Sequence, residues 1–150
     1  MTDRRVDVFF YGLFMDLDLL RQRGLRPRDP RLARLDGYDI DVRGRATLVV
    51  DGAARVHGVV AGLTHQELGA LYAEPSVREY RPEAVLVTLT DGRPVAALCY
   101  TRPGAGGPRD AAYAAKLLEL AGRLGLPGDY LERLQQLARE EPMTPGGGPL

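Results

Sequence analysis

The sequence predicts a single α+β domain whose first two-thirds are rich in strands and whose end is helical. Short apolar or alternating runs, typical of strands, recur between Val6 and Tyr100, and turns that contain Gly or Pro separate them. Two stretches with apolar residues at helical spacing follow. A length of 150 residues fits one domain and is enough to bury a core.

The first stretch predicts a buried strand, a sharp turn and a helix. The largely apolar run Val6–Phe10 leads to Gly12, where the chain is expected to turn. Asp16 can cap the helix that follows, which extends to about Arg23 and is closed by Gly24. A glycine lets the backbone come close to a bound group, and the amides around it can point together at an anion or a polarised carbonyl. The turn at Gly12 is therefore a candidate binding loop.

A strand with one buried face and then a hairpin are predicted next. Apolar residues alternate with acids over Gly37–Val42, which is the period of a half-buried strand. The runs Ala46–Val50 and Val56–Ala61 flank Asp51-Gly52, a dipeptide that favours a turn between antiparallel strands. We therefore expect these two runs to pair with each other.

A short helix and a second hairpin complete the strand-rich part. Thr64 and Glu67 have the spacing of a capping box, which starts a helix, and Pro75 prevents that helix from continuing. The runs Ala84–Thr90 and Val95–Tyr100 then predict two antiparallel strands. Their near-continuous apolar character favours strands that are covered on both faces or that close a barrel.

The C-terminal part predicts two amphipathic helices and a tail. One helix is expected from about Arg109 to Leu124, and another from Asp129 to Glu140. The Pro- and Gly-rich residues 143–150 are expected to be a flexible tail, so the domain spans residues 1–142. The loop Gly104–Gly107 between the strands and the helices is a candidate lid.

Composition narrows the class of protein. Twenty basic and twenty acidic residues give a formal net charge of zero, which argues against a nucleic-acid partner. Membrane spans need about 18 consecutive apolar residues, and no such run is present, so no membrane partner is expected. The single Cys99 excludes an internal disulfide and fits a reducing compartment. The expected location is the cytoplasm, because the first apolar run is also too short for a signal peptide.

The candidate catalytic group of this chain is a carboxylate. The two histidines and one cysteine lack the spacing of a zinc site, and we find no dinucleotide or phosphate-binding glycine motif, so no cofactor is expected. Glu74 stands out because Leu71, Tyr72 and Pro75 surround it with apolar character. Such surroundings disfavour the charged form of a carboxyl group and suit it to take and return a proton. The alternative is an ordinary, partly exposed glutamate after a helix.

Several motifs stand in a fixed order along the chain: Phe10-Tyr11-Gly12-Leu13-Phe14, Gly37-Tyr38, Val56-His57-Gly58-Val59-Val60, and Leu71-Tyr72-Ala73-Glu74-Pro75 followed by Tyr80 and the strand at Val85. In this order and spacing they resemble the gamma-glutamylcyclotransferase-like superfamily over roughly residues 6–100. The resemblance implies a small, twisted, barrel-like mixed sheet flanked by short helices. It also implies that Glu74 is the catalytic acid/base and that five residues bind the substrate: Tyr11, Gly12, Leu13, Phe14 and Tyr80.

The implied reaction cyclises a gamma-glutamyl group of a small amide or peptide to 5-oxoproline and releases the amine. The attacking nucleophile is the substrate's own α-amine, so this cyclotransferase chemistry needs neither a protein nucleophile nor a cofactor. Two residues depart from the family pattern. Leu13 replaces a small hydroxyl residue that is common after the glycine, and Pro75 stands where a Gly often follows the glutamate.

Two alternatives to an enzyme remain open. The first is a module that binds a small molecule in the family pocket without chemistry, which the loss of polarity at Leu13 motivates. The second is an interaction protein whose surface combines the C-terminal helices with a basic segment. That segment contains Arg21, Arg23, Arg26, Arg28, Arg31 and Arg34, and the helical stripe is Tyr113, Leu117, Leu120 and Leu124. The sequence leaves open the group attached to gamma-glutamate and the oligomeric state.

Overall fold

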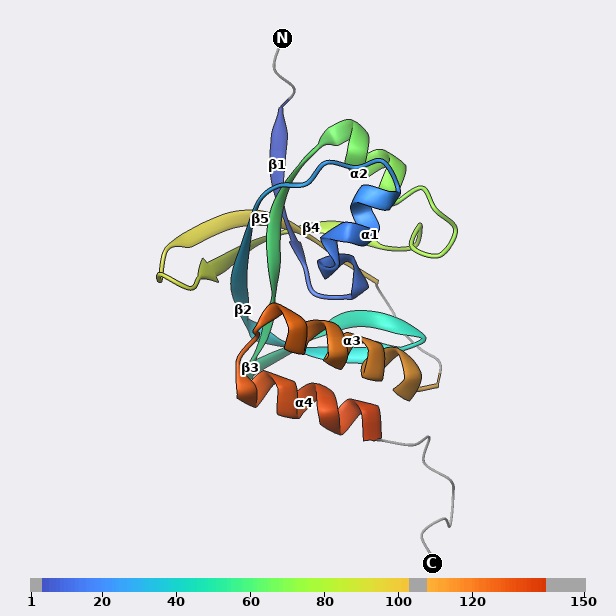
Figure 1. Cartoon of the computed structure of the whole chain (residues 1–150). Coiled ribbons are helices and arrows are strands. Elements are labelled where there is room, and N and C mark those ends of the chain that lie inside the picture. The colour runs from blue at the N-terminus through green and yellow to red at the C-terminus, as the bar shows by residue number, and fades with distance from the viewer. Residues whose placement is uncertain (1–3, 103–107, 140–150) are drawn as a thin grey trace, which may run out of the picture.

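The computed structural model describes residues 4–102 and 108–139 as a closed barrel with helices around it (Figure 1). The expected lid at Gly104–Gly107 and the expected tail at residues 143–150 lie outside the described residues. The strands are β1 (Arg5–Phe10), β2 (Arg28–Arg43), β3 (Arg45–Thr64), β4 (Arg81–Leu89) and β5 (Pro94–Thr101). The helices are the 3-10 turn η1 (Leu13–Met15), α1 (Leu17–Gln22), α2 (His65–Leu71), α3 (Ala111–Leu124) and α4 (Gly128–Arg139).

The barrel has the strand order β1-β3-β2-β4-β5 and closes on itself. Antiparallel pairs make up most of the sheet, including the predicted hairpin of β4 and β5. The closure is a parallel pair, in which Val8 of β1 faces Leu98 of β5 and Phe9 faces Cys99. The fold is thus α+β with a mixed, barrel-like sheet, and both predictions are confirmed. Cys99 is fully buried at this seam.

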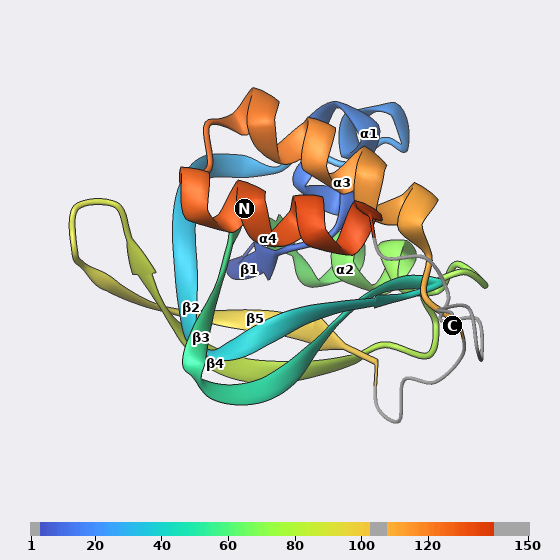
Figure 2. The same cartoon turned by 90° about the horizontal axis from the view of Figure 1, so that it is seen from below.

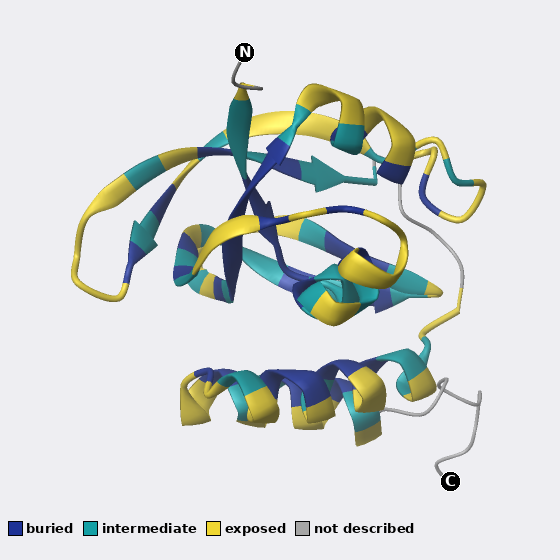
Figure 3. Ribbon diagram, turned by 45° about the horizontal axis from the view of Figure 1, so that its top comes forward, coloured by how far each residue is buried: buried dark blue, intermediate teal, exposed yellow. Residues whose placement is uncertain are grey.

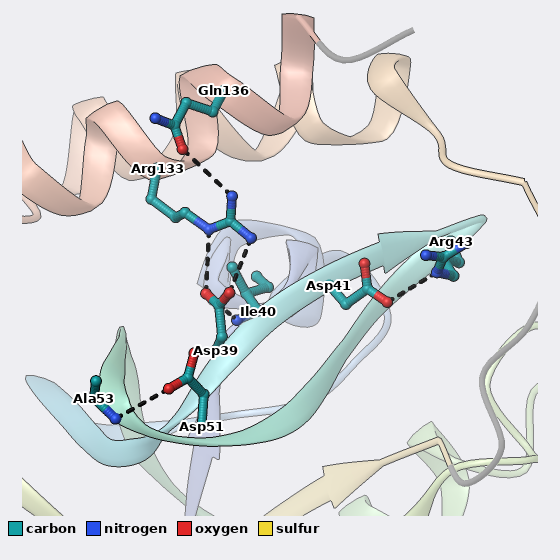
Figure 4. A network of polar contacts seen from close by, with 8 residues as sticks. All are labelled: Asp39, Ile40, Asp41, Arg43, Asp51, Ala53, Arg133 and Gln136. Carbon is teal, nitrogen blue, oxygen red and sulfur yellow. Dashed lines mark hydrogen bonds and ion pairs between the residues drawn. The ribbon is translucent and has the colours of Figure 1, made fainter. Parts of the chain in front are cut away.

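The hairpin predicted at Asp51-Gly52 is wrong. Both flanking runs belong to the single strand β3, and both pair with β2 instead of with each other. The chain reverses at Gly44, whose φ of +77° is a left-handed conformation that favours glycine. Asp36 pairs with Arg55 and Tyr38 pairs with Val50, so β3 has extra residues around Asp51 where β2 has only Gly37. Among these extra residues, the Asp51 carboxylate accepts a hydrogen bond from the Ala53 amide at 3.0 Å (Figure 4). The Asp-Gly pair therefore makes a bulge within a strand, not the end of one.

Helices α3 and α4 lie side by side against one end of the barrel (Figures 1 and 2). Their buried residues follow the side that faces the sheet, and their exposed residues lie on the other side (Figure 3). Leu117 and Leu120, from the stripe that motivated the interaction-protein hypothesis, are buried in the core. The apolar stripe is therefore core packing and does not offer a free docking face.

Local signals at the other helices act as predicted. The Asp16 carboxylate accepts from the Asp18 amide at the start of α1, and Thr64 and Glu67 form the complete capping box of α2. Glu67 also accepts from the amide of Arg26 at 2.7 Å, which attaches the start of α2 to the chain after α1. Among the helices of the described residues, none combines the length and the apolar character that crossing a bilayer requires.

Candidate functional site

A cavity of about 60 Å³ lies where the loop after β1, the start of β3, the segment after α2 and helix α3 meet. All five residues predicted to bind substrate line it: Tyr11, Gly12, Leu13, Phe14 and Tyr80. The first four are consecutive, and Tyr80 comes from a segment more than sixty positions later. The structure therefore brings both predicted parts of the site to one hollow, although their role in binding stays a prediction.

The loop after β1 is wound into the turn η1. The amides of Met15 and Asp16 donate to the carbonyls of Gly12 and Leu13, each at 3.0 Å. Gly12 has an extended backbone, so its need for glycine is not conformational. A Cβ atom there would lie 2.9 Å from the hydroxyl oxygen of Tyr113 and 3.5 Å from the Cβ atom of Ala46. Close approach of neighbouring groups is the reason that this position suits glycine.

Tyrosines form most of the polar lining of the cavity. The Tyr11 hydroxyl donates to the carbonyl of Tyr100 at 2.7 Å, and the Tyr80 hydroxyl donates to the carbonyl of Ala46 at 2.5 Å. The Tyr113 hydroxyl accepts a hydrogen bond from the amide of Leu13 at 3.3 Å. Burial raises the pKa of Tyr80 to about 12 and raises that of Tyr113 as well. At neutral pH these phenols are therefore uncharged groups that can donate a hydrogen bond.

Aromatic packing closes the cavity on the side of α2. The rings of Tyr72 and Tyr100 stack with centroids 3.7 Å apart and planes 7° from parallel. The ring of Phe14 meets that of Tyr72 edge to face, at 6.0 Å. These contacts hold the walls in a fixed shape.

Arg45 is the charged residue among those that line the cavity, and within the described part of the chain no acidic residue joins it there. Arg45 is the first residue of β3 and is half-buried. Sequence reasoning did not single out this arginine, because it looks like an ordinary polar residue after a turn. Tyr113 was named only as part of the helical stripe, and nothing in the sequence connected it to the Gly12 loop.

Glu74 lies near the cavity but is not among the residues that line it. Its carboxylate forms an ion pair with Arg23, the C-cap residue that follows α1, and its side chain is 37% exposed. The guanidinium carbon of Arg23 lies 5.6 Å from the ring centroid of Phe14, which does line the cavity. One arginine and one aromatic ring thus connect Glu74 to the hollow. The local sequence around Glu74 gave no sign of this partner, because Arg23 comes from a distant segment.

A second hollow lies between β2, β3 and α4. It is an open cleft of about 520 Å³ at which His57, Tyr130, Asp39 and Arg133 meet. The rings of His57 and Tyr130 are 5.1 Å apart, and burial lowers the pKa of His57. His57 is half-buried against α4. Within residues 4–102 and 108–139, no three His, Cys, Asp or Glu side chains are grouped as a metal site requires.

Residues 8–117 of the chain match the family model described as "Gamma-glutamyl cyclotransferase, AIG2-like". The chain belongs to this family. The matched residues include both walls of the cavity, from the loop after β1 to Tyr113 of α3. Among curated proteins, no sequence matches the chain.

Solved structures agree on the fold. A structure titled "Gamma-glutamyl cyclotransferase" is 21% identical with a TM-score of 0.77, and the match covers 93% of this chain and 90% of that one. The uncharacterized protein loc79017 from Homo sapiens is 22% identical with a TM-score of 0.73, over 93% of this chain and 89% of that one. YkqA from Bacillus subtilis is 24% identical with a TM-score of 0.76, over 94% of this chain but 56% of YkqA.

Proposed function

We propose that this protein is a cyclotransferase that converts a gamma-glutamyl amide or peptide into 5-oxoproline and a free amine. The observation that carries the proposal is the single cavity formed by the Tyr11–Phe14 loop and Tyr80, six positions after Glu74. Membership of the gamma-glutamyl cyclotransferase family supports the same reaction class. Glu74 is the proposed acid/base, and the substrate is a small molecule.

The cavity suits a reaction that folds its substrate. The α-amine of the glutamyl group attacks its own γ-carbonyl carbon, so the new C–N bond forms within one molecule and the amide C–N bond then breaks. A small hollow with stacked aromatic walls favours a folded glutamyl chain over an extended one, which brings the reacting atoms together. Loop amides are candidate donors to the oxyanion, and losing one well-placed donor costs on the order of 3 kcal/mol in known enzymes.

Glu74 is the proposed carrier of the proton that moves between the two nitrogens. Its carboxylate takes a proton from the attacking amine and returns it to the departing nitrogen, so no net proton is gained or lost. Proton transfer needs heavy atoms within about 3 Å, and such contacts often form only when substrate is bound. We therefore propose that substrate draws Glu74 away from Arg23 and toward the cavity, past the ring of Phe14.

The test of this proposal compares Glu74→Gln with Glu79→Gln. Glu79 is an exposed glutamate in the same segment, so its variant controls for the change of charge. Incubation with gamma-glutamyl dipeptides and gamma-glutamyl amines should yield 5-oxoproline with the wild type and with Glu79→Gln. Glu74→Gln should lose at least about 100-fold in kcat, the usual contribution of a general acid/base. Equal turnover by Glu74→Gln and wild type would remove Glu74 from the mechanism.

A second candidate is a binding module without turnover. The observation that favours it is that, of the residues the structure describes, no carboxylate lines the cavity, while Glu74 is held by Arg23. In that case a ligand raises the melting temperature, no 5-oxoproline forms, and Glu74→Gln binds the ligand as the wild type does. Product release by the wild type excludes this candidate.

A further inference from the structure

We propose that the cavity contains a carboxylate subsite built from the Arg45 guanidinium and the Tyr113 hydroxyl beside the Gly12 loop. The inference deepens the proposed function, on which it rests for the identity of the ligand. The ligand class is a small organic acid, of which a gamma-glutamyl compound is one case.

The first step of the argument is the charge of Arg45. Within the described residues the Arg45 side chain forms no hydrogen bond and no ion pair, although it is half-buried and lines the cavity. Arg43, two positions earlier and at the same turn, is paired with Asp41 at 3.0 Å. A half-buried cation that lines a hollow attracts an anion when no carboxylate of the described residues lines that hollow, because the low-polarity walls do little to screen the charge.

The second step is the Tyr113 hydroxyl. Its oxygen accepts from the Leu13 amide at 3.3 Å, and within the described part of the chain the hydroxyl donates no hydrogen bond. Burial raises the pKa of Tyr113 and the charge of Asp110 adds to this effect, while the Leu13 and Ala46 amides and the charge of Arg45 act in the opposite direction. The charge of Arg45 therefore acts on this oxygen, and the phenol keeps a proton that it can donate to a ligand.

The third step is the rigidity of the backbone that carries Arg45. The Tyr80 hydroxyl donates to the carbonyl of Ala46, the next residue. Thr47, which is 1% exposed, exchanges hydrogen bonds with the backbone of Arg102: its hydroxyl donates at 3.3 Å and accepts at 3.2 Å. Two successive residues after Arg45 are thus fixed from both sides. A cation on a fixed backbone loses less entropy when it binds than one on a loose loop.

The chemistry of these groups selects a carboxylate. A guanidinium offers two parallel N–H donors that match the two carboxylate oxygens, and the Tyr113 hydroxyl adds a third donor. An ammonium group would meet a like charge at Arg45 and no acceptor of opposite charge. In a gamma-glutamyl peptide the carboxylate has two possible sources: the α-carboxylate of the glutamyl group, or the carboxylate of the released amino acid.

The closing experiment measures binding, so that it does not depend on turnover. The probes are 5-oxoproline and its uncharged twin 5-oxoprolinamide, titrated by calorimetry into wild type, Arg45→Gln, Arg45→Lys and Tyr113→Phe. Arg55→Gln is the matched control, because Arg55 is on the same strand and lines the other hollow. Circular dichroism checks that each variant is folded.

We expect Arg45→Gln to weaken 5-oxoproline binding by at least about 10-fold while it leaves 5-oxoprolinamide binding unchanged. Arg45→Lys should recover part of the loss, and Tyr113→Phe should lose about 3-fold for the acid alone. Arg55→Gln should bind both probes as the wild type does. The proposal is overturned if Arg45→Gln loses affinity for acid and amide equally, or if neither the binding of 5-oxoproline nor the KM for gamma-glutamylglycine depends on Arg45.

Kinetics then separate the two sources of the carboxylate. If the subsite holds the α-carboxylate, Arg45→Gln raises KM for gamma-glutamylglycine and for gamma-glutamylmethylamine alike. If it holds the carboxylate of the leaving group, only gamma-glutamylglycine is affected. Acid binding that depends on Arg45, without any 5-oxoproline release, keeps the subsite and rejects the proposed activity. Release of 5-oxoproline that does not depend on Arg45, without Arg45-dependent acid binding, keeps the proposed activity and rejects the subsite.

Discussion

Two hollows of this protein, the cavity at the Gly12 loop and the cleft beside α4, use charge in opposite ways. In the cleft beside α4, the guanidinium of Arg133 forms two hydrogen bonds to the carboxylate of Asp39, at 3.2 and 2.9 Å (Figure 4). In the cavity, Arg45 has no such carboxylate among the described residues. A pair that satisfies its own charges contributes to stability, whereas an unpaired cation in a walled hollow is ready for a ligand. Pairing, more than the size of the hollow, therefore distinguishes a structural region from a candidate binding region.

The largest expected effect comes from Gly12→Ala, which should damage the cavity but not the fold. The new Cβ would crowd the Tyr113 hydroxyl, and that hydroxyl lies at the end of a side chain that can move aside. We expect kcat/KM to fall about 100-fold, equivalent to about 2.7 kcal/mol, because the loop and Tyr113 lose their relative position. The free energy of unfolding should change by less than about 1 kcal/mol. Urea unfolding and a 5-oxoproline assay measure the two quantities, and an active, strongly destabilised variant would contradict this picture.

Arg133→Gln should have the opposite profile at an intermediate magnitude. It breaks a two-pronged ion pair that attaches α4 to β2, and the pair is partly exposed. We expect a loss of about 1 kcal/mol in the free energy of unfolding and unchanged binding of 5-oxoproline. Asp39→Asn gives the same comparison from the other partner. If Arg133→Gln weakens ligand binding as much as Arg45→Gln does, the two hollows are not functionally distinct.

The smallest effect is a pH dependence carried by His57. Burial lowers its pKa in the folded protein below the usual 6.5, since Asp129 only partly opposes that effect. The unfolded chain then binds more protons than the folded chain as pH falls below 6.5, so acidification reduces stability until the lowered pKa is passed. His57→Gln should make the free energy of unfolding less dependent on pH between 7 and 5. A variant with the same pH dependence as the wild type would show that the effect arises elsewhere.

Local signals in the sequence were enough for most of the fold. Asp16 and the Thr64–Glu67 pair mark helix starts by chemistry that depends on a few neighbouring residues, and both were located correctly. The failure at Asp51-Gly52 has a physical cause: the same dipeptide serves a hairpin and a bulge, and only the pairing partner distinguishes them. Gly44, the real turn, has no comparable signature in its flanking residues.

In the candidate site, too, residues in local motifs could be predicted and contacts between distant segments could not. The Gly12 loop and Tyr80 belong to motifs that can be read from the chain, and the structure puts them at one cavity. Arg23 beside Glu74, and Tyr113 above Gly12, are contacts between segments that no local pattern connects. Such contacts form only when the barrel closes and α3 packs against it, so the sequence alone does not indicate them.

The hydrogen bond between Leu13 and Tyr113 spans 100 positions of sequence, and this has a consequence for biosynthesis. During translation, the ribosome releases all five strands before it releases the residue that completes the wall of the cavity. A nascent chain can therefore form its barrel while the hollow is still open on one side. Ligand recognition should begin only when the third helix has emerged and settled against the opening loop.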